Sequence, residues 1–173
     1  VRAGVARLLV SPAFLYRTEA DPADLGAGSA HRVSDVELAS RLSFFLWSSI
    51  PDDELFGLAK DGRLKSASVL EDQVRRMIAD SRADALVENF TGQWLQLRNL
   101  EQRVVPDLLL FPDFDEQLRN DMYKETELFF GYVLRDNRSA LELISADYTF
   151  VDERLARHYG IPGVYGPRFR KVK

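Results

Sequence analysis

The stretch Ser34-Asp-Val-Glu-Leu-Ala-Ser-Arg-Leu-Ser-Phe-Phe-Leu-Trp47 favours an all-helical protein. Ser34 and Glu37 have the spacing of a capping box, in which the serine hydroxyl and the glutamate carboxylate satisfy free backbone N–H groups at a helix start. The apolar residues that follow recur at helical spacing and form a broad stripe: Leu38, Leu42, Phe44, Phe45, Leu46 and Trp47. A helix with so little polar surface is expected at the centre of the fold.

The helical period recurs along the rest of the chain, and most of these segments have a start signal of their own. Further helices are expected over 1–17 with a break at Ser11-Pro12, over 52–60, from a second capping box at Ser68 and Glu71, from Ser81 to about Asn99, from Asp113 or Asp115 to about Arg135, and over 139–144 and 150–159. The one strand candidate is Arg168–Val172. We therefore predict an all-α fold, a single compact domain of about seven or eight helices with at most one short strand near the C-terminus. The helices from Ser34 and Asp115 are expected at its centre.

The loop 19–32, which contains Pro22 and two glycines, is the best internal boundary. Three parts are expected: the end of a preceding helical domain and a linker over 1–32, a helical domain over 33–160, and a linker to a following domain over 161–173. The chain starts inside an apolar-periodic stretch and stops without a helix stop signal. A longer parent protein is expected, with neighbouring domains of the same chain as partners.

Composition places the chain among globular proteins, since its 173 residues are 46% hydrophobic and 29% charged. The net charge of -4 is uneven: six Lys or Arg stand against two acidic residues in 151–173, which gives +4 there and -8 in the first 150 residues. A basic end is not the continuous basic face that phosphate binding needs, so no nucleic-acid partner is expected. No apolar run is long enough for a membrane span, and Val1–Val10 lacks a signal-peptide cleavage pattern.

Cofactor chemistry has little support in the residue types. The absence of cysteine excludes disulfides, thiolate zinc sites, iron–sulfur clusters and covalent attachment of a c-type haem within this segment. His31 in a loop and His158 near the end of a helix lack the neighbours that a catalytic triad or a metal site needs. At its position His158 is more typical of a charge partner for the helix C-terminus. We expect no cofactor and no metal in this segment.

Four polar residues lie on or beside the apolar stripes of their expected helices. Helical projection places Glu125 on the stripe of its helix, Gln93 beside a stripe, and Asn89 and Arg41 at stripe edges. Charged and amide groups in a core must be paired. We therefore predict a buried ion pair between Arg41 and Glu125, with Asn89 and Gln93 completing a structural network. No catalytic residue is assigned.

Two carboxylate clusters, 52–54 and 113–116, permit another interpretation. A pair of carboxylates about 5 to 9 Å apart is able to hydrolyse a glycoside. Both clusters stand at expected helix starts, where acidic side chains interact favourably with the helix dipole. The structural interpretation is preferred for both clusters.

Between Pro106 and Pro112, the apolar loop Leu108–Phe111 is expected to pack down onto the protein as a plug.

Four blocks of the sequence, taken in order, resemble the domain-of-unknown-function family 1592. They are Ala39-Ser-Arg-Leu-Ser-Phe-Phe-Leu-Trp-Ser-Ser-Ile-Pro-Asp-Asp-Glu-Leu55, Val87-Glu-Asn-Phe-Thr-Gly-Gln-Trp-Leu-Gln-Leu97, Lys124-Glu-Thr-Glu-Leu-Phe-Phe130 and Asp147-Tyr-Thr-Phe-Val-Asp-Glu-Arg-Leu-Ala-Arg-His-Tyr-Gly160. The resemblance covers about 33–160. Residues 1–19 look like the end of the companion family 1595, and Phe169–Val172 like the approach to the companion family 1588.

The resemblance implies a context and no catalysis. Such proteins, known largely from planctomycetes and related bacteria, are large, multidomain chains that often also carry a c-type cytochrome domain. The resemblance of this chain to them implies export or a periplasmic location. The family offers no established active-site residues.

Three functional hypotheses remain open. The first is a non-catalytic helical module that packs between companion domains. The second is part of an extracellular polymer-degrading hydrolase or oxidase, with Glu125 and one acidic cluster as acid and base in a solvent-reachable cleft. The third is a helical module that docks a partner through an exposed loop, Leu108–Phe111.

Overall fold

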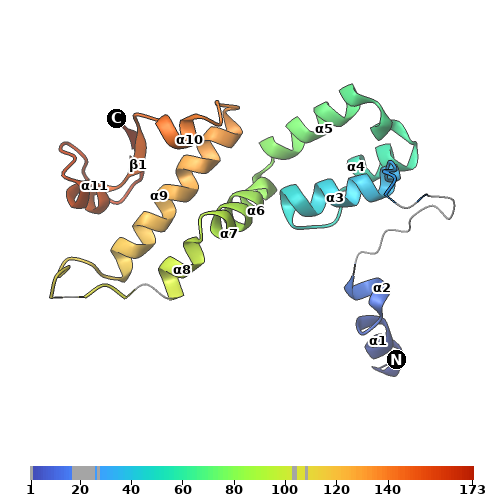
Figure 1. Ribbon diagram of the computed structural model, residues 1–173, viewed down its shortest axis with the longest axis horizontal. Coiled ribbons are helices and arrows are strands. Elements are labelled where there is room, and N and C mark those ends of the chain that lie inside the picture. Colours follow the sequence, from blue (N-terminus) through green and yellow to red (C-terminus); the bar gives the residue numbers. More distant parts are fainter. Residues whose placement is uncertain (1, 17–25, 27, 103–104, 108) are drawn as a thin grey trace.

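A computed structural model describes residues 2–16, 26, 28–102, 105–107 and 109–173, and it confirms a mostly helical protein (Figure 1). The first part contains α1 (Arg2–Leu9), α2 (Pro12–Leu15), α3 (Asp35–Trp47), α4 (Asp53–Lys60), the 3₁₀ turn η1 (Arg63–Lys65) and α5 (Ala67–Ala79). The middle contains the 3₁₀ turn η2 (Ser81–Ala83), α6 (Asp84–Leu86), the π-helical turn η3 (Val87–Thr91), α7 (Gly92–Trp94) and α8 (Leu97–Gln102). The last part contains α9 (Glu116–Arg135), α10 (Glu142–Ser145), β1 (Thr149–Val151), α11 (Glu153–Tyr159) and β2 (Arg170–Val172).

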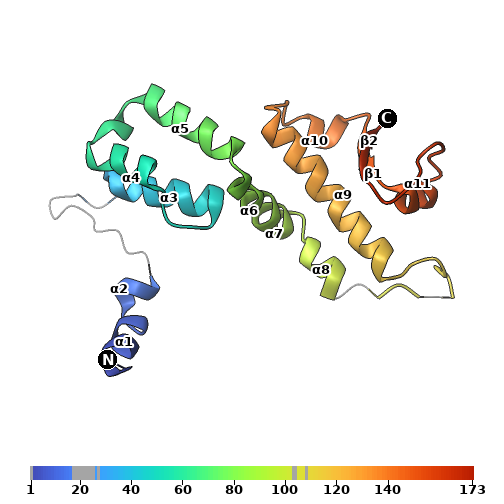
Figure 2. The same ribbon diagram turned by 180° about the vertical axis from the view of Figure 1, so that it is seen from behind.

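The core lies in two clusters of buried side chains. The first is built around α3 and contains Ala39, Leu46, Trp47, Leu55, Ala59, Leu64, Met77, Ala83 and Leu86. The second lies between α9, α11 and the C-terminal segment and contains Leu118, Val151, Leu155, Ala156 and Val164. Figures 1 and 2 show α3, α4 and α5 at one end, α9 to α11 at the other, and α6 to α8 between them. The two helices predicted at the centre therefore each organise one cluster.

Helix α3 begins with the predicted capping box. The Ser34 hydroxyl accepts a hydrogen bond from the Glu37 amide, and the Glu37 carboxylate accepts one from the Ser34 amide at 2.8 Å. The capping box predicted at Ser68 does not form. Helix α5 already begins at Ala67, with Ser66 as its N-cap, so Ser68 lies within the first turn, where its hydroxyl bonds that of Ser66.

The C-terminal strand candidate is confirmed, and it has a partner that was not predicted. Strands β1 and β2 pair antiparallel, with Phe150 opposite Lys171. The helix expected from Phe150 begins only at Glu153, because Asp152 is its N-cap and accepts a hydrogen bond from the Leu155 amide at 2.8 Å. The residues before this cap are left extended and pair with β2.

The helix expected from Ser81 to about Asn99 is interrupted twice. The segment Val87–Thr91 forms a π-helical turn, and Gln96 has a φ of 58°, which ends α7 before α8 begins. A π turn contains one more residue per turn than an α-helix, so the side chains after it are rotated by about 100° relative to an unbroken helix. Neither interruption is marked by proline.

Two apolar segments are exposed. Leu109, Leu110 and Phe111 expose 91%, 73% and 58% of their surface, so the expected plug is wrong for these three residues; Leu108 lies outside the described residues. Asp107 closes a local turn by accepting hydrogen bonds from the amides of Leu109, Leu110 and Phe111, which satisfies the backbone without packing the side chains.

The second exposed segment is the helix pair α1 and α2. The break between the two helices lies at Ser11-Pro12, as predicted. No residue of α1 is buried. Both views show this pair apart from the remaining helices (Figures 1 and 2). Within the described residues, no helix combines the length and the apolar character needed to cross a membrane.

The two serines provide a matched test of the capping box. Replacing Ser34 with alanine should destabilise the protein by about 1 kcal/mol, because it removes a side-chain acceptor from a helix start. Replacing Ser68 with alanine should change the free energy of unfolding by less than about 0.5 kcal/mol, as for other exposed positions. Urea unfolding followed by circular dichroism measures both free energies of unfolding. Equal losses of stability in the two variants would show that the Ser34 cap does not stabilise α3.

Candidate functional site

Glu125 is held by hydroxyl groups of the C-terminal segment. It is partly buried on α9, and its two carboxylate oxygens accept hydrogen bonds from the Thr149 hydroxyl and, at 2.8 Å, from the Tyr159 hydroxyl. The pKa of Tyr159 lies well above its ordinary value. Burial of the hydroxyl is the larger cause, and the hydrogen bond to Glu125 is the second. Glu125 therefore connects α9 with both β1 and α11.

The predicted network of Arg41, Asn89, Gln93 and Glu125 does not form. Arg41, Asn89 and Gln93 are all exposed, and the side-chain amide of Asn89 donates to the Ser48 hydroxyl at 2.9 Å. The physical reason is that the helices pack on different partners: α3 packs on α4 and α6, whereas the Glu125 region of α9 contacts the C-terminal segment. The π turn also places Asn89 and Gln93 at the surface.

Asn89 and Gln93 instead line a groove between α3 and the segment η3–α7. This groove has a volume of about 590 Å³, and its lining residues are all uncharged: Phe44, Phe45, Ser48, Leu86, Asn89, Phe90, Gln93 and Trp94. Phe45, Phe90 and Trp94 expose 59%, 41% and 55% of their surface, and we call these three residues the aromatic face. The Phe90 ring centroid lies 5.6 Å from that of Trp94 and 5.8 Å from that of Phe130, so ring packing holds Phe90 in place.

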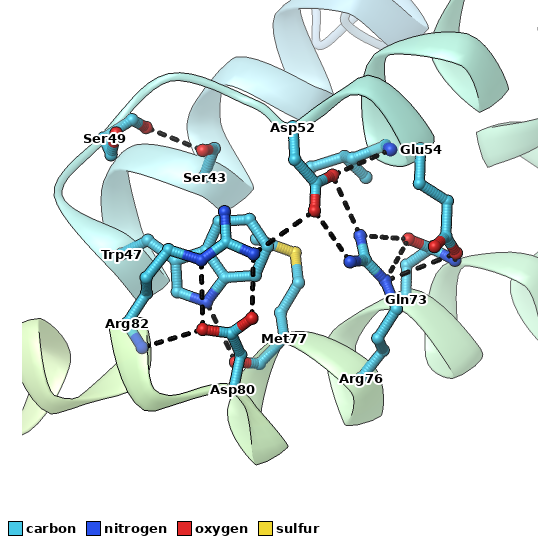
Figure 3. Close-up of polar contacts among 11 residues, drawn as sticks. Ser43, Trp47, Ser49, Asp52, Glu54, Gln73, Arg76, Met77, Asp80 and Arg82 are labelled. Atoms are coloured by element: carbon cyan, nitrogen blue, oxygen red, sulfur yellow. Dashed lines mark hydrogen bonds and ion pairs between the residues drawn. The ribbon is translucent and has the colours of Figure 1, made fainter.

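Beside the aromatic face, the buried Trp47 ring organises a network of charged side chains (Figure 3). The Arg82 guanidinium lies 3.5 Å from the ring centroid, and the indole N–H donates to the Met77 carbonyl at 2.9 Å. Arg82 pairs with Asp80 at 2.8 Å and with Asp52 at 3.4 Å. Trp47, the last residue of α3, is thus connected to α5 through Met77. It is connected to the start of α4 through Arg82 and Asp52.

Asp52 completes this network. It accepts a hydrogen bond from the Leu55 amide as the N-cap of α4 and pairs with Arg76 at 2.7 Å. The hydrogen bond from Arg76, which outweighs the opposing effect of burial, lowers the pKa of Asp52 to about 2. A carboxylate held ionised in this way is suited to a structural role and poorly suited to donating a proton.

The second acidic cluster is likewise structural. Asp115 is the N-cap of α9, accepts a hydrogen bond from the Leu118 amide at 2.9 Å, and pairs with Arg154 at 2.5 Å. The amide of Leu118 is the main reason that the pKa of Asp115 lies below its ordinary value. Both acidic clusters thus contain helix caps, as expected. Among the described residues, no group of three or more His, Asp and Glu side chains is placed to hold a metal ion.

His31 lies in the loop before α3, far from His158 in the sequence. His158 is in the last turn of α11, where its ring lies 5.5 Å from that of Tyr159. It also lines a polar groove with Asp115, Arg154 and Arg157, but both arginines are engaged by carboxylates there, Arg154 by Asp115 and Arg157 by Glu153. The aromatic face is the more distinctive surface.

These features define a helical domain whose acidic clusters cap helices and whose most distinctive surface is an exposed aromatic groove. The chain belongs to the family PSD4, described as a protein of unknown function (DUF1592), whose model matches residues 33–161. No curated protein and no solved structure matches the chain.

Acid should weaken the network around Trp47. Because the pKa of Asp52 is lowered from 3.8 to about 2, its contribution is complete above about pH 4 and is lost as the pH falls toward 2. A shift of this size corresponds to about 2 kcal/mol at neutral pH. The Asp52→Asn variant, which keeps a capping side chain, should be less stable than wild type at pH 6, and the difference should shrink toward pH 2. Denaturant unfolding across this range measures it, with Asp72→Asn on exposed α5 surface as the control.

The contribution of Glu125 to stability should depend on Tyr159 and not on Arg41. Removing the hydroxyl with Tyr159→Phe should cost about 1 kcal/mol, since it deletes one hydrogen bond to a carboxylate. Arg41→Met alters an exposed side chain and should change stability by less than about 0.5 kcal/mol. A double-mutant cycle of Arg41→Met with Glu125→Gln, followed by thermal unfolding, should show additive effects. A coupling energy above about 1 kcal/mol would restore the ion pair.

Proposed function

We propose that this domain is a non-catalytic helical packing module, and that a helix of a neighbouring domain in the same parent chain docks on its aromatic face. The observation that carries the proposal is the exposure of Phe45, Phe90 and Trp94 around a groove lined only by uncharged side chains. A contiguous aromatic patch on a protein surface is typical of an interaction site. Aromatic enrichment and depletion of charge also characterise the buried centres of protein interfaces.

The state of the acidic groups supports a module over an enzyme. Asp52 and Asp115 are helix caps paired with arginine, and both oxygens of Glu125 are occupied by hydroxyl donors. The grooves described above, between α3 and α7 and beneath α11, do not include Glu125. The acid and base that a polymer-degrading enzyme would need are thus engaged elsewhere.

A module between two neighbours needs two contact surfaces. The exposed turn Leu109–Phe111 is a second apolar surface, and it precedes α9 in the other half of the chain. In this proposal the parent is a large exported protein with a c-type cytochrome domain, in keeping with the family resemblance. The segment itself has no cysteine, so covalent haem attachment belongs to another part of such a parent.

The docking surface is testable in the parent protein. The double substitution Phe45→Ser/Trp94→Ser should uncouple this domain from its neighbour, because truncating buried aromatic anchors at an interface costs about 2 kcal/mol or more each. Calorimetry should then resolve a separate, lower thermal transition for the neighbouring domain. The matched control Glu71→Ser/Arg75→Ser removes an exposed ion pair on α5 and should leave the melting profile unchanged. Identical profiles for the aromatic variant and wild type would exclude the aromatic face as the docking surface.

A further inference from the structure

We infer that the helix which docks on the aromatic face is the chain's own N-terminal pair, α1 and α2. This inference rests on the proposed function and names the occupant of that surface. The aromatic face and the helix pair over residues 2–16 are both exposed apolar surfaces among the described residues.

The helix pair has the pattern of a segment that binds in a groove. Val5, Leu8 and Leu9 recur at the i, i+3 and i+4 spacing by which amphipathic helices insert their anchors. The apolar series continues into α2 with Phe14 and Leu15, and all five side chains are about half exposed or more. A helix of eight residues is marginal in water by itself, so α1 needs packing against another surface to be stable.

The groove offers complementary chemistry. Its aromatic rings provide apolar surface for aliphatic anchors, and the amide side chains of Asn89 and Gln93 at its edge are able to bond the free backbone groups of a helix end. The groove also has no charged lining residue that would repel the segment 2–16, which contains two arginines and no acidic residue.

The connection between the two surfaces is long enough. Seventeen residues, 16–32, separate the end of α2 from Val33, the residue before the Ser34 cap, and a chain of that length spans up to about 55 Å. A tether of this kind keeps the helix at an effective concentration in the millimolar range. Even a weak helix–groove contact is then occupied within a single molecule.

The lack of native cysteine makes proximity directly measurable in the 173-residue chain. The pair Leu8→Cys/Gln93→Cys joins the apolar face of α1 to the edge of the groove. The matched control Arg7→Cys/Gln93→Cys uses the opposite face of the same helix. Under mild oxidation, the Leu8 pair should form an intramolecular disulfide at least about tenfold faster than the control, as expected for a docked rather than a merely tethered thiol. Mass spectrometry after proteolysis identifies the bond.

A second readout is the exposure of Trp94. Trp47 is buried at 3% exposure, so acrylamide quenching of the indole fluorescence reports mainly on Trp94. The Leu8→Asp/Leu9→Asp variant should increase quenching, because it expels the helix, while Ala3→Asp on the opposite face should not. Since no residue of α1 is buried elsewhere, neither variant should unfold the two core clusters.

The outcomes separate this inference from the proposed function. Equal oxidation rates for both cysteine pairs, with unchanged Trp94 quenching, would overturn α1–α2 as the occupant. A disulfide found only in a dimer would assign the helix to a second copy and would likewise overturn docking within one chain. If either result accompanies loss of domain coupling in the Phe45→Ser/Trp94→Ser parent, the docking surface stands and another helix occupies it.

Discussion

The contact of Arg82 with the Trp47 ring is the interaction on which most of the first half of the molecule depends. The ring is the end of α3, its N–H is fixed to the backbone of α5, and the guanidinium above it is oriented by Asp80 and Asp52. The arginine cation stays charged without help, so the two carboxylates act by orienting it over the indole ring, where the stacking is favourable. One aromatic side chain thereby sets the positions of α3, α4 and α5 together.

In the second half of the molecule, a lysine and a glutamate connect the helices and strands around the second cluster. There, Lys171 of β2 lies 4.2 Å from the Tyr132 ring centroid and 3.8 Å from that of Tyr148, and it also donates to the Tyr132 hydroxyl. Glu125 joins β1 and α11 to the same helix through two hydroxyls. Polar groups at the surface of each apolar cluster thus select one arrangement of short elements that have little intrinsic stability.

The sequence predicted the elements far better than their contacts. Local signals were sufficient for α3, α4 and α9, because a capping side chain and an apolar stripe act within a few residues. The partners of Glu125 were missed because Thr149 and Tyr159 lie 24 and 34 residues away in the sequence, and a helical pattern does not show which distant element it packs against. The aromatic face was missed because an unbroken helix was assumed across Val87–Thr91, and an apolar residue in a helix is assigned to the core by default.

The π turn in that segment fixes the direction in which the side chains after it point. A single-residue deletion within Val87–Thr91 would restore regular α-helical geometry and turn Phe90 and Trp94 relative to α3 without changing their identity. The direction in which the domain presents its rings is therefore encoded by the length of one short segment. A variant shorter by one residue there would present the same aromatic side chains in a different direction.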